Sequence, residues 1–199
     1  MAEKLAEKMM MMIFEHVEHT EYERVLNDAN LSVEETMNLS QKLYYMNESK
    51  WRTQEISHPH GVNPFDVISF LEARVALLVR TGDDGYADWM RAMFDLANRY
   101  SDQAGLERKF DLYTELIEST KSDLLREERS VFFYTRALNR LAQLTEYWHG
   151  EDEARPLWQE LTDYAIDSIE EEDEQHQALN VIRSNAPWFA EENNVLFQF

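Results

Sequence analysis

Apolar residues recur along this chain at the three- and four-residue spacing of amphipathic helices. Over residues 2–27 this spacing predicts one continuous helix, carried by Leu5, Met9, Ile13, Val17 and Val25. No segment alternates between apolar and polar residues for long enough to predict a sheet, and 5 Gly and 4 Pro supply few of the turns that an all-β fold needs. The sequence therefore predicts an all-α fold of antiparallel helical hairpins.

Capping and turn residues predict where the later helices begin and end. Ser32-Val33-Glu34-Glu35 is a capping box that starts a helix running to about residue 56. Asn63-Pro64 starts a strongly apolar helix over 65–80, which we expect to be central and buried. Ser122-Asp123 begins a long helix that Gly150 closes. Pro187 is expected to stop a short last helix over 178–182.

These boundaries predict the domain organisation. We expect an N-terminal helical hairpin over residues 1–57, a hairpin array over 64–187 and an apolar C-terminal tail over 188–199, together in one compact unit. Residues 57–62 are the clearest linker in the chain. The tail ends in several large apolar residues, and we expect it to dock on the helices because their exposure would be a liability.

Two segments of the chain are similar to each other. Residues 81–97 and 149–165 both begin with a Gly-acid-acid turn, place Trp near the start of a helix and end in Ala. Their offset, about 68 residues, is twice the period of tetratricopeptide repeats. Residues 64–185 thus resemble tetratricopeptide-like helical repeats, which implies a scaffold that presents a concave groove to a protein or peptide. A generic helical bundle with two similar turns is the alternative.

Charge and composition restrict the classes of partner. The 199 residues carry a formal net charge of −20 and no Cys, which excludes disulfides, thiolate metal sites and Cys nucleophiles. The negative charge argues against direct binding to nucleic acid or to an anionic membrane. The apolar run at residues 9–14 is too short to span a bilayer. We expect a cytoplasmic protein whose partner is another protein.

Histidine–carboxylate pairs are the only hints of metal chemistry. Glu146-x-x-His149 and Asp173-x-x-His176 have the spacing of ligands in di-iron helical bundles, and His16 lies among Glu15, Glu18 and His19. These pairs fall at turns or in runs of acids, so we interpret them as solvated surface and expect no metal and no cofactor. Short motifs for a nucleophile or a phosphate-binding loop do not occur in the sequence.

Arginines give the most function-like pattern. On the long helix, Arg129, Arg136 and Arg140 fall on one face, and we predict a partner-binding surface made of Arg126, Arg129, Arg136 and Arg140 with Tyr134 and Trp148. A second cluster, Arg74, Arg80, Arg91 and Arg99, could line a groove for a carboxylate, a phosphate or an acidic peptide. The alternative is that these arginines form internal ion pairs with Glu127, Glu128 and Asp95.

The favoured function is a non-enzymatic adaptor or regulator that binds another protein. A second hypothesis is an acidic nucleic-acid mimic that inhibits a nucleic-acid-binding protein, using the acids of residues 15–35 and 151–174. An enzyme built on a helical bundle is the third. Binding to a basic partner that weakens steeply with salt would favour the mimic.

Overall fold

The computed structural model describes residues 2–57, 64–100, 105–121, 128–193 and 195. Every regular element in these ranges is a helix and none is a strand, which confirms the all-α prediction. The chain divides into two compact units, Met1–Leu106 and Glu107–Phe199. The predicted linker at 57–62 lies outside the described residues except for Ser57, the last residue of α3, and the predicted helix start at Ser122-Asp123 lies outside them entirely.

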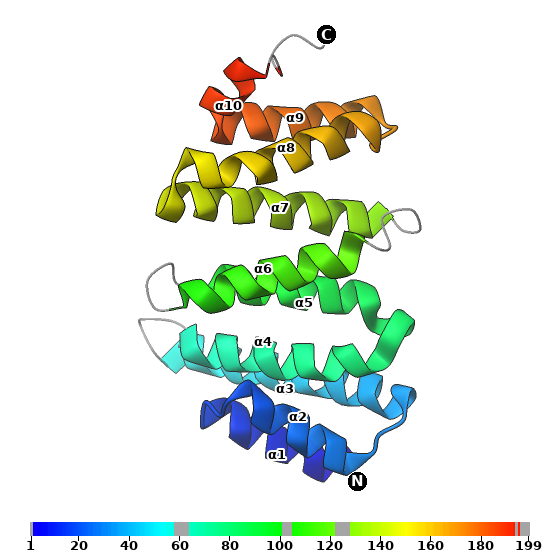
Figure 1. The fold of residues 1–199 in the computed structure, drawn as a ribbon. Coiled ribbons are helices and arrows are strands. Elements are labelled where there is room, and N and C mark those ends of the chain that lie inside the picture. Colours follow the sequence, from blue (N-terminus) through cyan, green and yellow to red (C-terminus); the bar gives the residue numbers. More distant parts are fainter. Residues whose placement is uncertain (1, 58–63, 101–104, 122–127, 194, 196–199) are drawn as a thin grey trace. The chain divides into compact units, whose positions relative to one another are not determined.

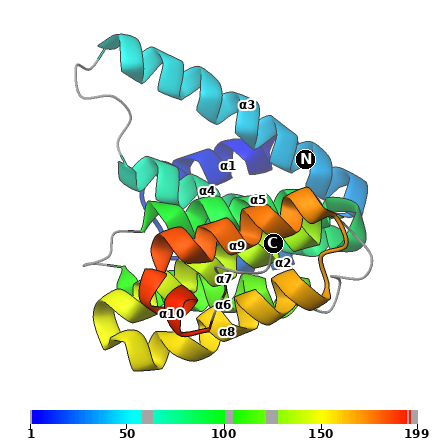
Figure 2. The same cartoon turned by 90° about the horizontal axis from the view of Figure 1, so that it is seen from above.

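The first unit is built around one central helix. Its elements are α1 (Ala2–Phe14), α2 (His19–Ala29), α3 (Val33–Ser57), α4 (Pro64–Leu78), the 3₁₀ helix η1 (Val79–Gly85) and α5 (Tyr86–Arg99) (Figure 1). Helix α4 packs against α1, α2, α3 and α5, as its continuous apolar sequence predicts. Figure 2 shows that α3 extends beyond α1, with which it packs.

The prediction of one continuous helix over residues 2–27 is wrong. The chain breaks between α1 and α2, where His16 adopts a left-handed backbone with φ of 52°. Nε2 of His16 lies 2.7 Å from a carboxylate oxygen of the buried Asp66 at the start of α4. The break lets α1 and α2 each place an apolar face in the core, with Ile13 and Tyr22 both fully buried.

The second unit holds the remaining helices. These are α6 (Leu106–Lys121), which begins at the last residue of the first unit, α7 (Glu128–His149), α8 (Glu151–Asp167), α9 (Glu172–Asn185) and α10 (Pro187–Glu192). Helix α8 packs against α7 and α9, and α10 packs against α9. The largest side chains of this core include Trp158, Tyr113, Tyr134 and Phe189.

One predicted boundary near the C-terminus is wrong. Helix α9 begins at Glu172 within the acid run and ends at Asn185, so it is much longer than 178–182. It ends just before Pro187, as predicted, and Pro187 also starts α10, because a proline fits the first turn of a helix, where its missing N–H is not needed. The expected docking of the tail holds as far as Val195, which is buried and whose carbonyl accepts hydrogen bonds from Arg183. Residues 196–199 lie outside the described residues.

The two similar sequence segments form hairpin turns, one in each unit. Gly82 lies in η1, between α4 and α5, and Gly150 lies between α7 and α8, and both have a positive φ, of 56° and 101°. The turns differ in length, because seven residues of 3₁₀ helix join α4 to α5 while Gly150 alone separates α7 from α8. Membership of a repeat family therefore stays a prediction.

Candidate functional site

The exposed face of α7 carries a row of arginines and aromatic rings. Phe132, Arg136, Arg140 and Tyr147, which we call the α7 stripe, are spaced by four, four and seven residues and so share one side of the helix. Phe132 is 47% exposed and Tyr147 is 77% exposed, which is unusual for rings of this size. At 1.5 Å per residue the α7 stripe is about 22 Å long.

The arginines of the α7 stripe have no acidic partner in the part of the chain that the structure describes. The Arg136 guanidinium lies 4.0 Å from the centre of the Phe132 ring, and Arg140 donates a hydrogen bond of 3.1 Å to the Gln143 side chain. Neither arginine is within 4.0 Å of a carboxylate oxygen of any described side chain. Both cations are therefore available to an external acceptor.

The other residues of the predicted partner-binding surface lie elsewhere. Tyr134 is 2% exposed, and its hydroxyl donates to the Glu160 carboxylate at 2.8 Å, on the buried side of α7. Trp148 is 41% exposed and contacts Tyr147 edge to face, next to the end of the α7 stripe. Arg126 lies outside the described residues, and Arg129 is in the first turn of α7 with its side chain undescribed.

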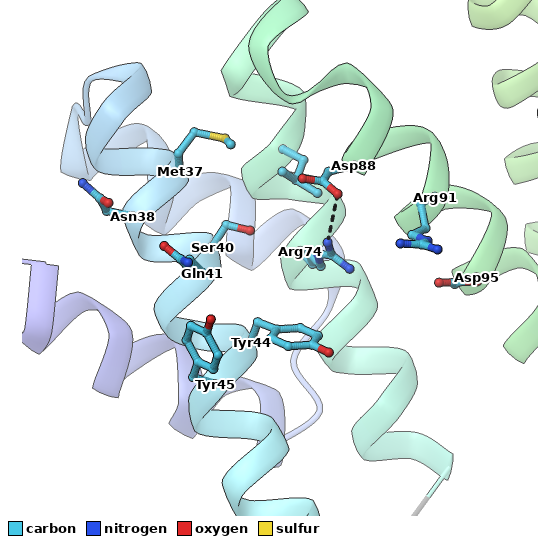
Figure 3. A pocket seen from close by; sticks show the side chains of 11 residues that line it. Met37, Asn38, Ser40, Gln41, Tyr44, Tyr45, Arg74, Asp88, Arg91 and Asp95 are labelled. Atoms are coloured by element: carbon cyan, nitrogen blue, oxygen red, sulfur yellow. Dashed lines mark ion pairs between the residues drawn. The ribbon is translucent and has the colours of Figure 1, made fainter. Parts of the chain in front are cut away.

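The first unit contains a polar groove of about 770 Å³ between α3, α4 and α5 (Figure 3). The second predicted arginine cluster contributes two of its members, Arg74 from α4 and Arg91 from α5. A third member, Arg80, serves the fold instead, because it donates to the Leu26 carbonyl and the Asn27 side chain at the end of α2. The structure thus separates the cluster into groove residues and a structural residue.

The groove also holds residues that sequence reasoning missed. Tyr44 and Tyr45 of α3 are 45% and 59% exposed and line it, and the Tyr44 ring points toward α4 (Figure 3). Asp88 and Asp95 of α5 complete the groove, which thus carries two arginines and two aspartates. Partial withdrawal from water raises the pKa of Asp95, more than the nearby Arg91 lowers it. In the sequence, the only sign of this groove was the pair of adjacent tyrosines, Tyr44 and Tyr45. Neighbouring residues of a helix point in different directions, so at least one of the two rings must lie off the apolar face.

Three residues of the histidine–carboxylate pairs, Glu146, His149 and His16, contact other parts of the fold. Glu146 accepts hydrogen bonds of 3.0 Å from the indole N–H groups of both Trp158 and Trp188, while His149 packs edge to face against Phe110. His16 contacts the carboxylate of Asp66. The described residues contain no group of three or more His, Asp or Glu side chains placed to hold a metal ion.

Comparison of the chain with protein-family models, curated proteins and solved structures finds no match. Among the helices that the structure describes, none combines the length and apolar character needed to cross a bilayer. The α7 stripe and the groove of the first unit are therefore the candidate functional surfaces.

Proposed function

We propose that this protein is a non-enzymatic adaptor or regulator that binds an acidic segment of another protein through the α7 stripe. The observation that carries the proposal is the exposure of Arg136 and Arg140 without a carboxylate partner among the described residues, in a chain with 39 Asp and Glu. In so acidic a chain, two neighbouring arginines without a carboxylate partner among the described residues concentrate positive charge on one face of α7.

The chemistry of the α7 stripe fits a protein partner. Arg, Tyr and Trp are the side chains that most often dominate binding energy at interfaces, and all three occur at Arg136, Arg140, Tyr147 and Trp148. Residues four apart on a helix lie about 6 Å from each other, so Arg136 and Arg140 match two carboxylates at the same spacing on a partner helix. A planar guanidinium forms two parallel hydrogen bonds to each carboxylate.

Charge reversal tests the proposal. We expect Arg136→Glu with Arg140→Glu to weaken capture of the partner by roughly 700-fold, since two interface arginines contribute about 2 kcal/mol each. The melting temperature should stay nearly unchanged because neither side chain is buried. The matched control reverses Lys4 and Lys8 of α1, which are exposed, four residues apart and equal in charge. Equal loss of capture in both double variants would refute a role for the α7 stripe.

Salt dependence separates this proposal from the nucleic-acid mimic. The net charge of −20 repels an acidic partner at long range, so moderate salt should leave the affinity unchanged or raise it by screening that repulsion. A mimic binds a basic partner and loses affinity steeply as salt increases. A captured partner whose affinity falls steeply with salt, and survives the Arg136 and Arg140 reversals, would replace the adaptor proposal with the mimic.

A further inference from the structure

The groove of the first unit contains an arginine whose hydrogen-bonding capacity is almost unused. The Arg74 side chain is 18% exposed, and its Nε atom is buried without an acceptor. Nη2 of Arg74 lies 3.6 Å from the Asp88 carboxylate, which is longer than a hydrogen bond. No other carboxylate of the described residues comes within 4.0 Å of it. A guanidinium has five N–H donors, and burying even one of them, here the Nε–H, without an acceptor is costly.

Asp88 is held independently of Arg74. Its side chain is 53% exposed, so water solvates the carboxylate. It also lies in the first turn of α5, where the helix dipole favours a negative charge. Because Asp88 has these two other sources of stabilisation, it loses little if Arg74 turns to another carboxylate. The Arg74–Asp88 ion pair, drawn dashed in Figure 3, is therefore exchangeable.

We propose that the groove binds a peptide carboxylate through Arg74, and that this carboxylate takes the place of Asp88. The Nη atoms of Arg74 point into the groove and present the planar fork that a carboxylate matches (Figure 3). The exposed rings of Tyr44 and Tyr45 offer apolar contact to neighbouring peptide groups. Two arginines balance two aspartates in the groove, which suits one carboxylate better than a phosphate dianion.

The Arg74 side chain itself reports on binding. Its buried Nε–H is shielded from water and should give a slowly exchanging signal in a ¹⁵N NMR spectrum. We expect an acetylated, amidated hexapeptide of alternating Glu and Ala to shift this signal, and the matching Gln–Ala hexapeptide to leave it in place. A Gln–Ala hexapeptide with a free C-terminal acid distinguishes a terminal carboxylate from a side-chain carboxylate. Equal effects of the Glu and the amidated Gln peptides would refute the proposal.

Two substitutions act in opposite directions. Arg74→Gln should weaken binding of the Glu peptide about tenfold or more, because it removes charge-assisted hydrogen bonds. The affinity of Arg74→Lys for the Glu peptide should lie between those of the wild type and Arg74→Gln, since lysine keeps the positive charge but lacks the planar fork of donors. Asp88→Asn should tighten binding several-fold by removing the competing carboxylate. If the Arg74–Asp88 pair only stabilised the fold, Asp88→Asn would lower the melting temperature and would not tighten binding of the Glu peptide.

Binding of the Glu peptide to Asp88→Asn tests the proposal even if Arg74→Gln fails to fold. The matched control is Arg24→Gln, which removes an exposed arginine of α2 outside the groove and should leave peptide binding unchanged. Reversal of Arg136 and Arg140 should also leave it unchanged, because neither residue lines the groove. Failure of the α7 stripe and failure of the groove are thus distinguishable.

Discussion

Glu146 connects two tryptophans of the second unit, and its removal should destabilise that unit strongly. Its two carboxylate oxygens each accept one indole N–H at 3.0 Å, from Trp158 of α8 and from Trp188 of α10. Trp158 is 0% exposed, so in Glu146→Ala its N–H becomes a buried donor without an acceptor, at a cost of about 1.5–3 kcal/mol. Trp188 is less buried, and water replaces part of its bond. We expect a total loss of about 2–4 kcal/mol of unfolding free energy.

Urea unfolding followed by tryptophan fluorescence measures this loss, since both affected tryptophans report on the second unit. Glu146→Gln should cost about half as much, because an amide keeps one acceptor oxygen and turns a donor toward the other indole. Glu170→Ala, an exposed acid between α8 and α9, is the matched control and should stay within about 0.5 kcal/mol of the wild type. A Glu146→Ala protein as stable as this control would show that the indole hydrogen bonds contribute nothing.

Three further predictions concern a cap, a turn and an acid-sensitive contact. Ser32→Ala should cost about 1 kcal/mol and Ser32→Gly less, measured by urea unfolding, because the Ser32 hydroxyl accepts the Glu35 N–H at the start of α3. Gly150→Ala should cost about 1–3 kcal/mol by the same measurement, since φ of 101° with ψ of 177° is essentially restricted to glycine; a cost below that of Ser32→Ala would contradict this reasoning. Burial alone would raise the pKa of Glu160, but hydrogen bonds from Lys121 and Tyr134 outweigh it and hold that pKa below its ordinary value. A lowered folded-state pKa contributes stability that is present above the unfolded-state pKa and is lost as pH falls through the folded-state pKa. Glu160→Gln should therefore destabilise the protein at neutral pH, and the difference from the wild type should vanish once pH falls below the lowered folded-state pKa.

Local signals in the sequence predicted those features of the fold that depend on neighbouring residues. The capping box is confirmed, with the Ser32 N–H donating to the Glu35 carboxylate at 3.0 Å and the Ser32 hydroxyl accepting in return. The break between α1 and α2 was missed because it depends on a contact across 50 residues, that of His16 with Asp66. Helical spacing continues through residues 15–18, so periodicity alone carries no sign of the turn.

The candidate sites were likewise predicted where they depend on neighbouring residues and missed where they depend on packing between helices. Helical spacing placed Arg136 and Arg140 on one side of α7, but it could not say that Tyr134 faces the core, since burial depends on where α8 packs. The groove was less accessible to sequence reasoning, because Tyr44, Arg74 and Asp88 come from three helices that only the fold brings together. For Glu146 the sequence pattern pointed to a different role. Its spacing from His149 is typical of metal ligands, whereas in the structure its carboxylate accepts hydrogen bonds from two indole N–H groups.

The arginines of this chain differ in what they do for the fold, and that difference indicates where a ligand can bind. Arg80 and Arg183 donate to backbone carbonyls and tie segments together, so replacing either would damage the structure first. Arg74, Arg136 and Arg140 form no hydrogen bond to a described carboxylate, so their charge adds little to folding. In a chain of net charge −20, positive side chains that pair with no described carboxylate, or only loosely as Arg74 does with Asp88, are the ones that a partner's carboxylates can bind.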